Sequence, residues 1–408
     1  MKIIPSFKPS ISYKELRAVL LRILLNEACD QQINMFENRF ALYVGVKHAI
    51  RVPSARWGLY CILESLGFRE GDEIIMPAFT YFAVPAAIVR LGLKPVFVDI
   101  NPCNLNIDAQ KIKDNITERT RAVIPTHLCG FVCGLEEILD IAQKYNIKVI
   151  EDCAQSLGAE YKNKKTGAWG DAAYFSFGVT KNFTTLDGAM IVMDNDALAD
   201  KIRRRLSKVD EAGSFLLLSR WLKACIIKIS VSSILFPYIY YLIRVFSFFG
   251  IDIINAVFHE KMSAPGDLSG TCLLNGIQAG LGMTQLSDLD GKNNARMKKG
   301  LKLYESLKDF ENTRTPSLEA GGKNIFSTCP ILFKGKKNIK KILLKNGIDV
   351  SSGYMRNCAR LDIFKEYKKE CPNASRAEHE VLYLPMYPEL TDSELMYMSE
   401  IIKRITGN

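Results

Sequence analysis

The sequence has few of the residues that build metal centres or disulfide frameworks, and those it has are scattered. Its 408 residues include only four histidines, and its eleven cysteines contain no Cys-x-x-Cys pair; Cys129 and Cys133 are the two closest. Structural zinc sites need paired Cys or His ligands at short spacings, so we expect no bound metal. The chain begins MKIIPSFKPS, without an apolar run after its first basic residue. This start and the odd number of cysteines favour reduced thiols and a cytoplasmic location.

The most apolar segment is poorly suited to crossing a bilayer. This segment, residues 215–258, contains an uncharged run at 229–243, and Pro237 lies within that run. As a helix the run would reach about 22 Å, against about 30 Å for the hydrocarbon core of a bilayer. We therefore do not expect a membrane span here.

The overall composition excludes a disordered or fibrous chain. Apolar residues make up 48% and charged residues 24% of the sequence, which is ordinary for a globular protein with a large core. The 54 basic and 44 acidic residues give a net charge of +10, which suits nucleic acid, anionic lipid or phosphorylated substrates alike. Because no recognised nucleic-acid-binding motif accompanies this charge, we expect no nucleic-acid partner.

Short apolar runs alternate with amphipathic stretches in the first half of the chain. The runs that we predict as strands are residues 47–52, 73–76, 95–100, 121–126, 148–153, 173–177 and 189–193. Helical spacing is found at residues 57–66, 84–91 and 135–145. This pattern is typical of repeated βα units around a mainly parallel sheet, so the sequence predicts an α/β fold.

A smaller α+β domain is predicted after the most apolar segment. The helices expected there are residues 274–290, 296–307, 337–346 and 392–404, and residues 326–333 are strand-like. We place a large domain at residues 1–290 and a small domain at residues 291–408. The large domain contains an apolar, basic-flanked insertion at about 210–262.

Two residues with acid–base chemistry follow strands of the predicted sheet. Asp152 ends the strand at 148–153, and Lys181 lies on a loop, 178–188, between two strands. A lysine on a short loop can form a Schiff base with an aldehyde cofactor if its pKa is lowered, and a carboxylate can hold a proton on a cationic heterocycle. Each residue alone also has an ordinary explanation, a turn cap for Asp152 and a solvated amine for Lys181.

Further candidates lie at neighbouring strand ends. The turn at residues 52–59 leads from a strand into a helix, whose first N–H groups, with Arg56, could bind an anion. Ser176 could donate a hydrogen bond to a phosphate, and Tyr81 could cover a planar ring. A plain turn, a strand serine and a core aromatic are the alternatives. Together, an amine, a carboxylate, a phosphate cup and an aromatic side chain match what pyridoxal phosphate (PLP) needs.

The order and the residue sequences of these motifs resemble those of a known family. The segments that carry the resemblance are GDEIIMPAFTYFA, KPVFVDINPCNLNID, AVIPTHLCG, KVIEDCAQSLGAEY, GAWGDAAYFSFGVTKNFTTLDGAMIV and YLPMYPELTDSEL. They resemble the DegT/DnrJ/StrS family of PLP-dependent sugar aminotransferases. The resemblance covers residues 1 to about 208 and resumes near residue 268.

This resemblance implies a fold type I enzyme, a homodimer with its active sites at the subunit interface, and a set of site residues. Lys181 would be the catalytic residue, acting as Schiff-base lysine and proton shuttle, and Asp152 would pair with the pyridine nitrogen. Tyr81 would stack on the ring, and Gln155 would hydrogen-bond the 3-hydroxyl oxygen. The groups that would hold the phosphate are Ser176 and the turn of Ser54, Ala55 and Arg56.

The resemblance also implies a reaction. Family members usually move an amino group from L-glutamate to the keto group of a nucleotide-linked sugar. For this chain it implies the same transfer, to a nucleotide- or lipid-linked keto-sugar, for cell-surface polysaccharide or glycolipid biosynthesis. The retained Lys181 argues against the family's dehydratase branch, in which that lysine is replaced. The alternative is a catalytically degenerate, membrane-associated scaffold of the same fold.

The sequence departs from the family pattern around the phosphate. Where members usually have Ser-Gly-Thr, this chain has Ser54-Ala55-Arg56, and the family's Gly-Glu-Gly-Gly appears as residues 186–189. The asparagine and arginine that members usually send across the dimer align with Thr271 and Leu273. We therefore expect Arg56 to supply the missing charge within its own subunit.

The apolar segment at residues 214–258 is the largest departure. Basic and aromatic residues punctuate it, among them Arg220, Trp221, Lys223 and Tyr238. Such flanks suit a helix that lies in the membrane interface, while a helical hairpin buried against the dimer partner, or an enlarged core, fits equally well. The first alternative predicts peripheral contact with the inner face of the cell membrane.

Overall fold

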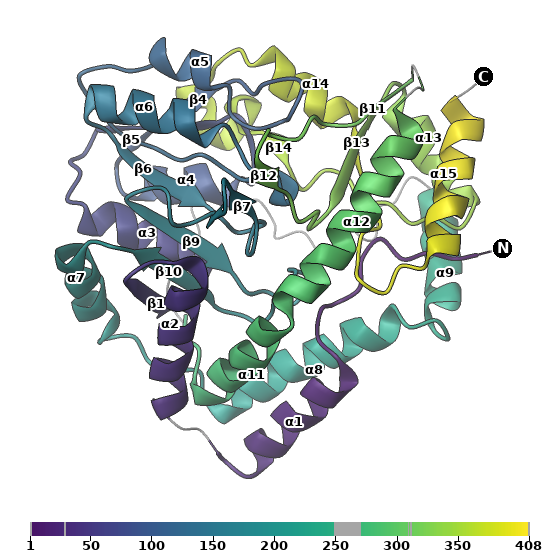
Figure 1. The fold of residues 1–408 in the computed structure, drawn as a ribbon, viewed down its shortest axis with the longest axis horizontal. Coiled ribbons are helices and arrows are strands. Elements are labelled where there is room, and N and C mark those ends of the chain that lie inside the picture. The colour runs from purple at the N-terminus through teal and green to yellow at the C-terminus, as the bar shows by residue number, and fades with distance from the viewer. Residues whose placement is uncertain (1, 28–29, 249–270, 309, 311, 407–408) are drawn as a thin grey trace.

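The computed structural model describes residues 2–27, 30–248, 271–308, 310 and 312–406 (Figure 1). Within these residues a seven-stranded sheet forms the centre of the molecule, in the order β1-β10-β9-β6-β5-β2-β4. Its strands are β1 (His48–Val52), β2 (Glu73–Pro77), β4 (Lys94–Val98), β5 (Thr120–Val123), β6 (Lys148–Asp152), β9 (Ala172–Ser176) and β10 (Ala189–Met193). Only β10 runs antiparallel to its two neighbours, so the prediction of a mainly parallel sheet is confirmed.

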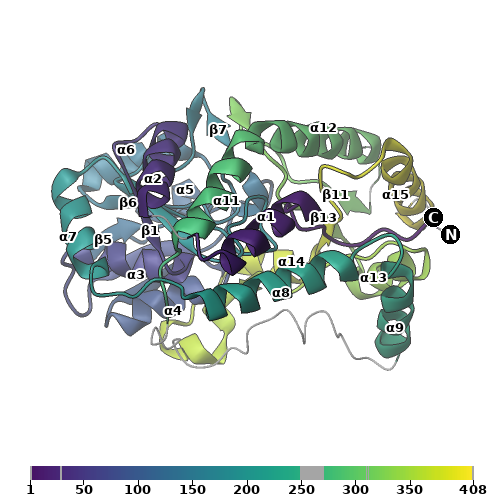
Figure 2. The ribbon, with the colours of Figure 1, turned by 90° about the horizontal axis from the view of Figure 1, so that it is seen from below.

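Helices cover both faces of this sheet (Figures 1 and 2). They include α2 (Asp30–Val44), α3 (Ala55–Ser65), α4 (Ala83–Arg90), α6 (Leu135–Tyr145), α7 (Asp196–Leu206) and α11 (Gly276–Ser287), with the short α5 (Ala109–Lys113). Successive strand residues point to opposite faces, so on β9 the side chain of Tyr174 packs in the core with α3, α4 and α7, and Phe175 packs in the core with α2 and α11. Burial on both faces explains why the strands are continuous apolar runs.

The C-terminal part of the chain is built on a small antiparallel sheet of β11 (Thr313–Arg314), β13 (Cys329–Phe333) and β15 (Val381–Leu384). Its helices are α12 (Leu289–Leu307), α13 (Lys336–Lys345), α14 (Pro372–Glu380) and α15 (Asp392–Thr406). The predicted break between helices at residues 291–295 is wrong, because α11 ends at Ser287 and α12 runs unbroken from Leu289. The division at residues 290 and 291 stays a prediction.

Short elements connect the two sheets. The small strands are β3 (Phe79–Thr80), β7 (Glu160–Tyr161), β8 (Lys164–Lys165), β12 (Gly322–Lys323) and β14 (Arg356–Asn357), and the short helices are η1 (Leu128–Gly130), η2 (Cys358–Arg360) and η3 (Asp362–Tyr367). β14 pairs with β3, and β12 pairs with β7. These pairs join residues beyond 320 to the edge of the central sheet at which its parallel strands end.

The described part of the insertion forms two helices, α8 (Ser214–Ser230) and α9 (Phe236–Phe248). The uncharged run at residues 229–243 is not one helix, as expected from Pro237: α8 ends at Ser230, and Pro237 lies in the first turn of α9, where its missing N–H is not needed. α8 packs against α1 (Tyr13–Leu24), and the Nε1–H of Trp221 donates to the carbonyl of Leu16 at 2.8 Å. No helix among the described residues is long and apolar enough to cross a membrane.

The insertion leaves and rejoins the large domain at one point. The N–H of Ala212 donates to the carbonyl of Leu273, and the N–H of Leu273 donates to the carbonyl of Asp210, each at 2.8 Å. These two hydrogen bonds close the base of the insertion.

Candidate active site

The register of the central sheet brings the predicted site residues to one edge. Ala189 on β10 pairs with both Val52 and Ser176, so β1 and β9 end side by side. Asp152, at the end of β6, pairs with Tyr174, two residues before the end of β9. The turn into α3, the end of β9 and the carboxylate at the end of β6 therefore lie along the same edge, and the loop of Lys181 begins there.

The first turn of α3 lies at this edge. Ser54 is the N-cap, and its Oγ accepts the N–H of Trp57 at 3.3 Å. Ala55 and Arg56 are the first two residues of the helix. Gly58 lets the helix approach the sheet, since a Cβ there would lie 3.3 Å from side-chain atoms of Val52 and Ile191. The arrangement suits a bound anion.

Asp152 is buried at the end of β6. Its Oδ1 accepts the N–H of Ala154 at 3.0 Å. Burial raises the pKa of this carboxyl, while the Ala154 N–H, the Tyr174 hydroxyl and the positive charge of Lys181 act in the opposite direction. A cation placed against this carboxylate would offset its desolvation and would itself be kept protonated.

Lys181 is half-buried in the loop between β9 and β10. Its backbone N–H donates to the carbonyl of Gly178 at 3.0 Å, which forms a tight turn at the start of the loop. Burial lowers the pKa of the amine, and the negative charge of Asp152 opposes this shift. A lower pKa increases the neutral fraction of the amine, which is the nucleophilic form.

The loop that carries Lys181 is held along its length. Asn182 Nδ2 donates to the carbonyl of Leu157 at 3.0 Å, and Gln278 Nε2, from α11, donates to the carbonyl of Thr185 at 2.9 Å. The inserted helix α8 adds an ion pair, in which Arg220 Nη2 lies 3.1 Å from Asp187 Oδ2. The amine is therefore presented by a fixed loop.

The inner face of α8 also packs on this loop. Leu217, Ala224 and Ile227 of α8 are buried in one cluster with Val179 and Leu186, which flank Lys181 in sequence. The prediction that the insertion enlarges the core is thus correct for this face. The sequence patterns did not link the insertion to the lysine loop.

Gln155 is oriented by a neighbouring strand end. Its Oε1 accepts the N–H of Cys129 at 3.0 Å, and Cys129 itself has a positive φ of 59°. The buried Cys129 thiol lies beside Thr328 and Tyr354, and burial raises its pKa to about 12. Sequence reasoning missed this cysteine, although its place after β5 at the same edge of the sheet is the signal that identified the other candidates.

Tyr81 and Leu273 complete the comparison with the predicted residues. Tyr81 follows β3, beyond the end of β2, two strands from β6 in the sheet order, and it is half-buried with its ring centroid 4.8 Å from that of Phe82. Leu273 is 5% exposed and packs in the core of its own chain. Leu273 aligns with a residue that family members send across the dimer. This chain therefore has no polar side chain at that position.

A buried acid lies on the opposite face of β6 from Asp152. Glu151 accepts hydrogen bonds from His127 Nε2 at 3.0 Å and from the N–H groups of Gly167, Trp169 and Gly170 at 2.8 Å each. With Cys153 these two side chains are close enough to be considered as metal ligands. The carboxylate is already fully engaged by protein donors, so we assign it a structural role in holding residues 167–170.

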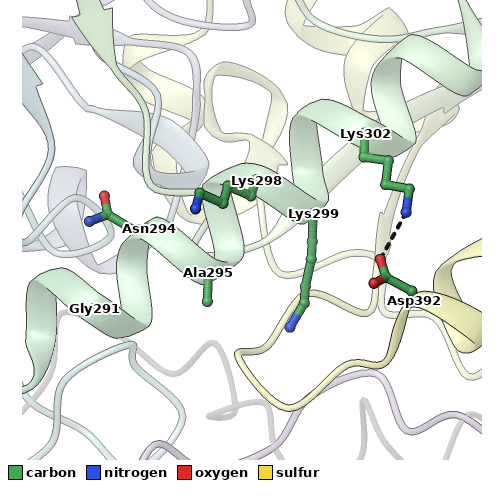
Figure 3. A pocket seen from close by; sticks show the side chains of 7 residues that line it. All are labelled: Gly291, Asn294, Ala295, Lys298, Lys299, Lys302 and Asp392. Atoms are coloured by element: carbon green, nitrogen blue, oxygen red, sulfur yellow. Dashed lines mark hydrogen bonds and ion pairs between the residues drawn. The ribbon is translucent and has the colours of Figure 1, made fainter.

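A surface pocket on α12 has no connection to this edge. It has a volume of about 400 Å³ and is lined by side chains that include Lys298, Lys299 and Lys302 (Figure 3). Lys299 Nζ donates to the carbonyl of Pro388, and Lys302 Nζ lies 2.9 Å from Asp392 Oδ1. These lysines serve packing between α12 and the loop before α15.

The fold and the edge of the sheet described above are those of a PLP-dependent aminotransferase. The sequence profile of the DegT/DnrJ/EryC1/StrS aminotransferase family matches residues 14–403, and the chain belongs to this family. It is 44% identical to the GDP-perosamine synthase of Caulobacter vibrioides over 168 residues, 41% of this chain and 45% of that protein. It is 28% identical to the spore coat polysaccharide biosynthesis protein SpsC of Bacillus subtilis, over 92% of this chain and 89% of that protein.

Solved structures agree on the fold. DesV of S. venezuelae superimposes with a TM-score of 0.79 at 23% sequence identity, covering 100% of both chains. The prediction of the family, the fold class and the cofactor is confirmed by these comparisons.

Proposed function

We propose that this aminotransferase transfers an amino group from L-glutamate to the keto group of a nucleotide- or lipid-linked sugar, for cell-surface polysaccharide or glycolipid biosynthesis. The resemblance to a GDP-perosamine synthase and to a spore coat polysaccharide biosynthesis protein supports the substrate class. Family membership favours this enzyme over the catalytically degenerate scaffold.

The observation that carries the proposal is that β6, which ends in Asp152, and β9, which leads into the loop of Lys181, end at the same edge of the sheet. A half-buried amine with a lowered pKa lies on a braced loop, close enough to a buried carboxylate for the two charges to shift each other's pKa. Bound here, PLP would supply an electron sink for the electron pair left on the carbon next to the transferred nitrogen when that carbon loses a proton. In this proposal Lys181 Nζ holds the cofactor and then accepts and returns the proton that moves during amino transfer.

The remaining site residues fit the cofactor by their chemistry. Asp152 keeps the ring nitrogen protonated, since a cation there relieves the desolvation that now raises the pKa of the carboxyl. Gln155 is fixed through its Oε1, which leaves its Nε2–H groups to donate to the ring oxygen. Tyr81 covers the ring. The phosphate is held by Ser176, Ser54, Arg56 and the N–H groups of Ala55 and Arg56.

We also propose that the chain works as a homodimer in the cytoplasm. The family resemblance aligns Leu273 and Thr271 with residues that members send across the dimer, and in this chain Leu273 is buried and Thr271 is half-buried. In this proposal Arg56, the second residue of α3, supplies that charge from within the same subunit. Solution mass measurements on the purified protein test the dimer.

A half-reaction assay tests the proposed function. The pyridoxamine-loaded protein is mixed with a panel of nucleotide- and lipid-linked keto-sugars, and amino-sugar formation is followed by mass spectrometry. L-Glutamate and other amino acids are then compared as donors. Lys181→Ala should lose the visible absorbance of bound PLP and about 10²–10⁴-fold in rate, while Lys302→Ala on α12 should retain both. Full turnover by Lys181→Ala, or amination of keto acids but of no keto-sugar, would refute the proposal.

A further inference from the structure

Among the residues that the structure describes, the outer face of α8 is apolar and exposed. Phe215, Leu218, Leu222, Ile226 and Ile229 are exposed and recur at intervals of three and four residues, which places them on one face of the helix. Phe215 is 87% exposed and Ile226 is 59% exposed. We call this row the α8 stripe. Ordinary surfaces carry single exposed apolar side chains, whereas a continuous row marks an interaction surface.

The turn after α8 and the helix α9 continue this pattern. Ile234 is 81% exposed, and Tyr238, Tyr241, Leu242 and Val245 are exposed along one side of α9. The opposite side of α9 is buried, with Phe236 and Tyr240 packed against Leu344. We call the exposed set the α9 stripe. In Figure 2, α8 runs along the lower border of the molecule and α9 stands beyond its end on the same border.

Within the inserted segment the charged side chains have one sign. The sequence contains no aspartate or glutamate between Glu211 and Asp252. Lys223 on α8 and Arg244 on α9 are exposed, so cations accompany both stripes. Arg220 does not contribute to this surface, because it is directed inward to Asp187.

We propose that the α8 and α9 stripes dock the enzyme on an anionic lipid surface. A helix of 17 residues is about 25 Å long, so α8 can lie along a membrane and bury its stripe at the boundary of headgroups and acyl chains. Exposed tyrosine rings and lysine or arginine side chains suit the headgroup layer. This proposal goes beyond amino transfer and does not depend on which sugar is aminated.

A second copy of the chain fits this surface less well. Most homodimers are twofold symmetric, so the same patch would meet itself. Lys223 and Arg244 would then enter the interface from both copies, and the stretch between Glu211 and Asp252 offers no acid to pair with them. Anionic lipid headgroups supply the complementary charge, which a copy of the same surface does not.

Co-sedimentation of the full-length holoenzyme with lipid vesicles tests the proposal. We expect binding to vesicles of phosphatidylcholine with phosphatidylglycerol, weaker binding to phosphatidylcholine alone, and weakening by salt. The double variant Leu222→Glu/Ile226→Glu should lose binding. The double variant Lys223→Ser/Arg244→Ser should bind anionic vesicles more weakly, by about fivefold for each removed charge. Leu301→Glu, at an exposed leucine on α12, should bind like the unmodified protein.

Three results would overturn the proposal. The first is no vesicle binding by the unmodified protein, and the second is binding by Leu222→Glu/Ile226→Glu that equals that of the unmodified protein. The third is an oligomer that forms without vesicles and that this variant dissociates, because the stripe would then be the contact surface for a second copy. PLP absorbance verifies that each variant is folded. Should the glutamate variant lose PLP, Leu222→Ser/Ile226→Ser takes its place. Activity on a water-soluble nucleotide-linked keto-sugar is measured in parallel, so failure of membrane docking is distinguished from failure of the proposed function.

Discussion

The ion pair between Arg220 and Asp187 links the insertion to the loop of the catalytic lysine, and its contribution can be measured. Arg220→Met removes the charge but retains the apolar stem, and Asp187→Asn removes the partner charge while its Oδ1 can still accept the N–H of Gly188, now at 2.8 Å. The two atoms of the pair are 3.1 Å apart, and the Arg220 side chain is 15% exposed. Asp187 is 46% exposed, so solvent screening reduces the interaction to about 1 kcal/mol.

A contribution of this size corresponds to roughly a fivefold change in an equilibrium constant. If the pair holds the loop in its PLP-binding conformation, each single variant should weaken PLP binding about fivefold, and the double variant should bind no worse than either single variant. Titration of the apoprotein with PLP, followed by visible absorbance, measures all four dissociation constants. High salt should narrow the differences between them.

The matched control is Lys223→Met, which removes an exposed charge from the same helix. We expect its PLP affinity to equal that of the unmodified protein. A coupling energy near zero in the double variant cycle, or an equal loss of affinity in Lys223→Met, would show that α8 does not position the lysine loop through this pair.

Two further predictions concern the site itself. Arg56→Ala should weaken PLP retention by roughly tenfold or more if the guanidinium bonds the phosphate, and Arg56→Lys should retain part of the affinity for PLP. Unchanged PLP occupancy of Arg56→Ala after dialysis would contradict a role of Arg56 in binding the phosphate. Lys181→Met should raise the stability of the apoprotein at neutral pH, because burial lowers the pKa of the Lys181 amine in the folded state and so penalises its charged form. The free-energy penalty is complete at pH values below the lowered pKa of Lys181, and it disappears as pH rises from that pKa to the ordinary value near 10.5. The gain in the urea midpoint of unfolding should therefore shrink at high pH. A gain that is independent of pH would contradict this explanation.

The strands and the lysine loop could be predicted because their signals are local. The run at 148–153 became β6 (Lys148–Asp152), and the loop at 178–188 lies between β9 and β10 as expected. Both faces of these strands are buried, so continuous apolar runs identify them without reference to distant segments. The placement of Asp152 and Lys181 at the same edge then follows from the parallel arrangement of the strands.

Other features depend on contacts between distant residues. α8 is apolar on two sides, with Leu217 and Ile227 on one and Leu222 and Ile226 on the other, so the sequence does not reveal which side is covered. The packing of α1 decides it. α12 continues through residues 291–295, where the buried Asn293 bonds the carbonyl of Leu157 at 3.0 Å, and such tertiary contacts override a weak local pattern.

The two hydrogen bonds that close the base of the insertion, between residues 210–212 and Leu273, mean that its length can vary without moving a strand of the central sheet. In this respect the segment is modular: chain can be gained or lost beyond that base while the register of β10 is kept. The inner face of α8 limits this variation, because Val179 and Leu186 on the lysine loop are buried against α8. The central sheet does not need the inserted segment to keep its register, but the core beside Lys181 needs α8 to bury its apolar side chains.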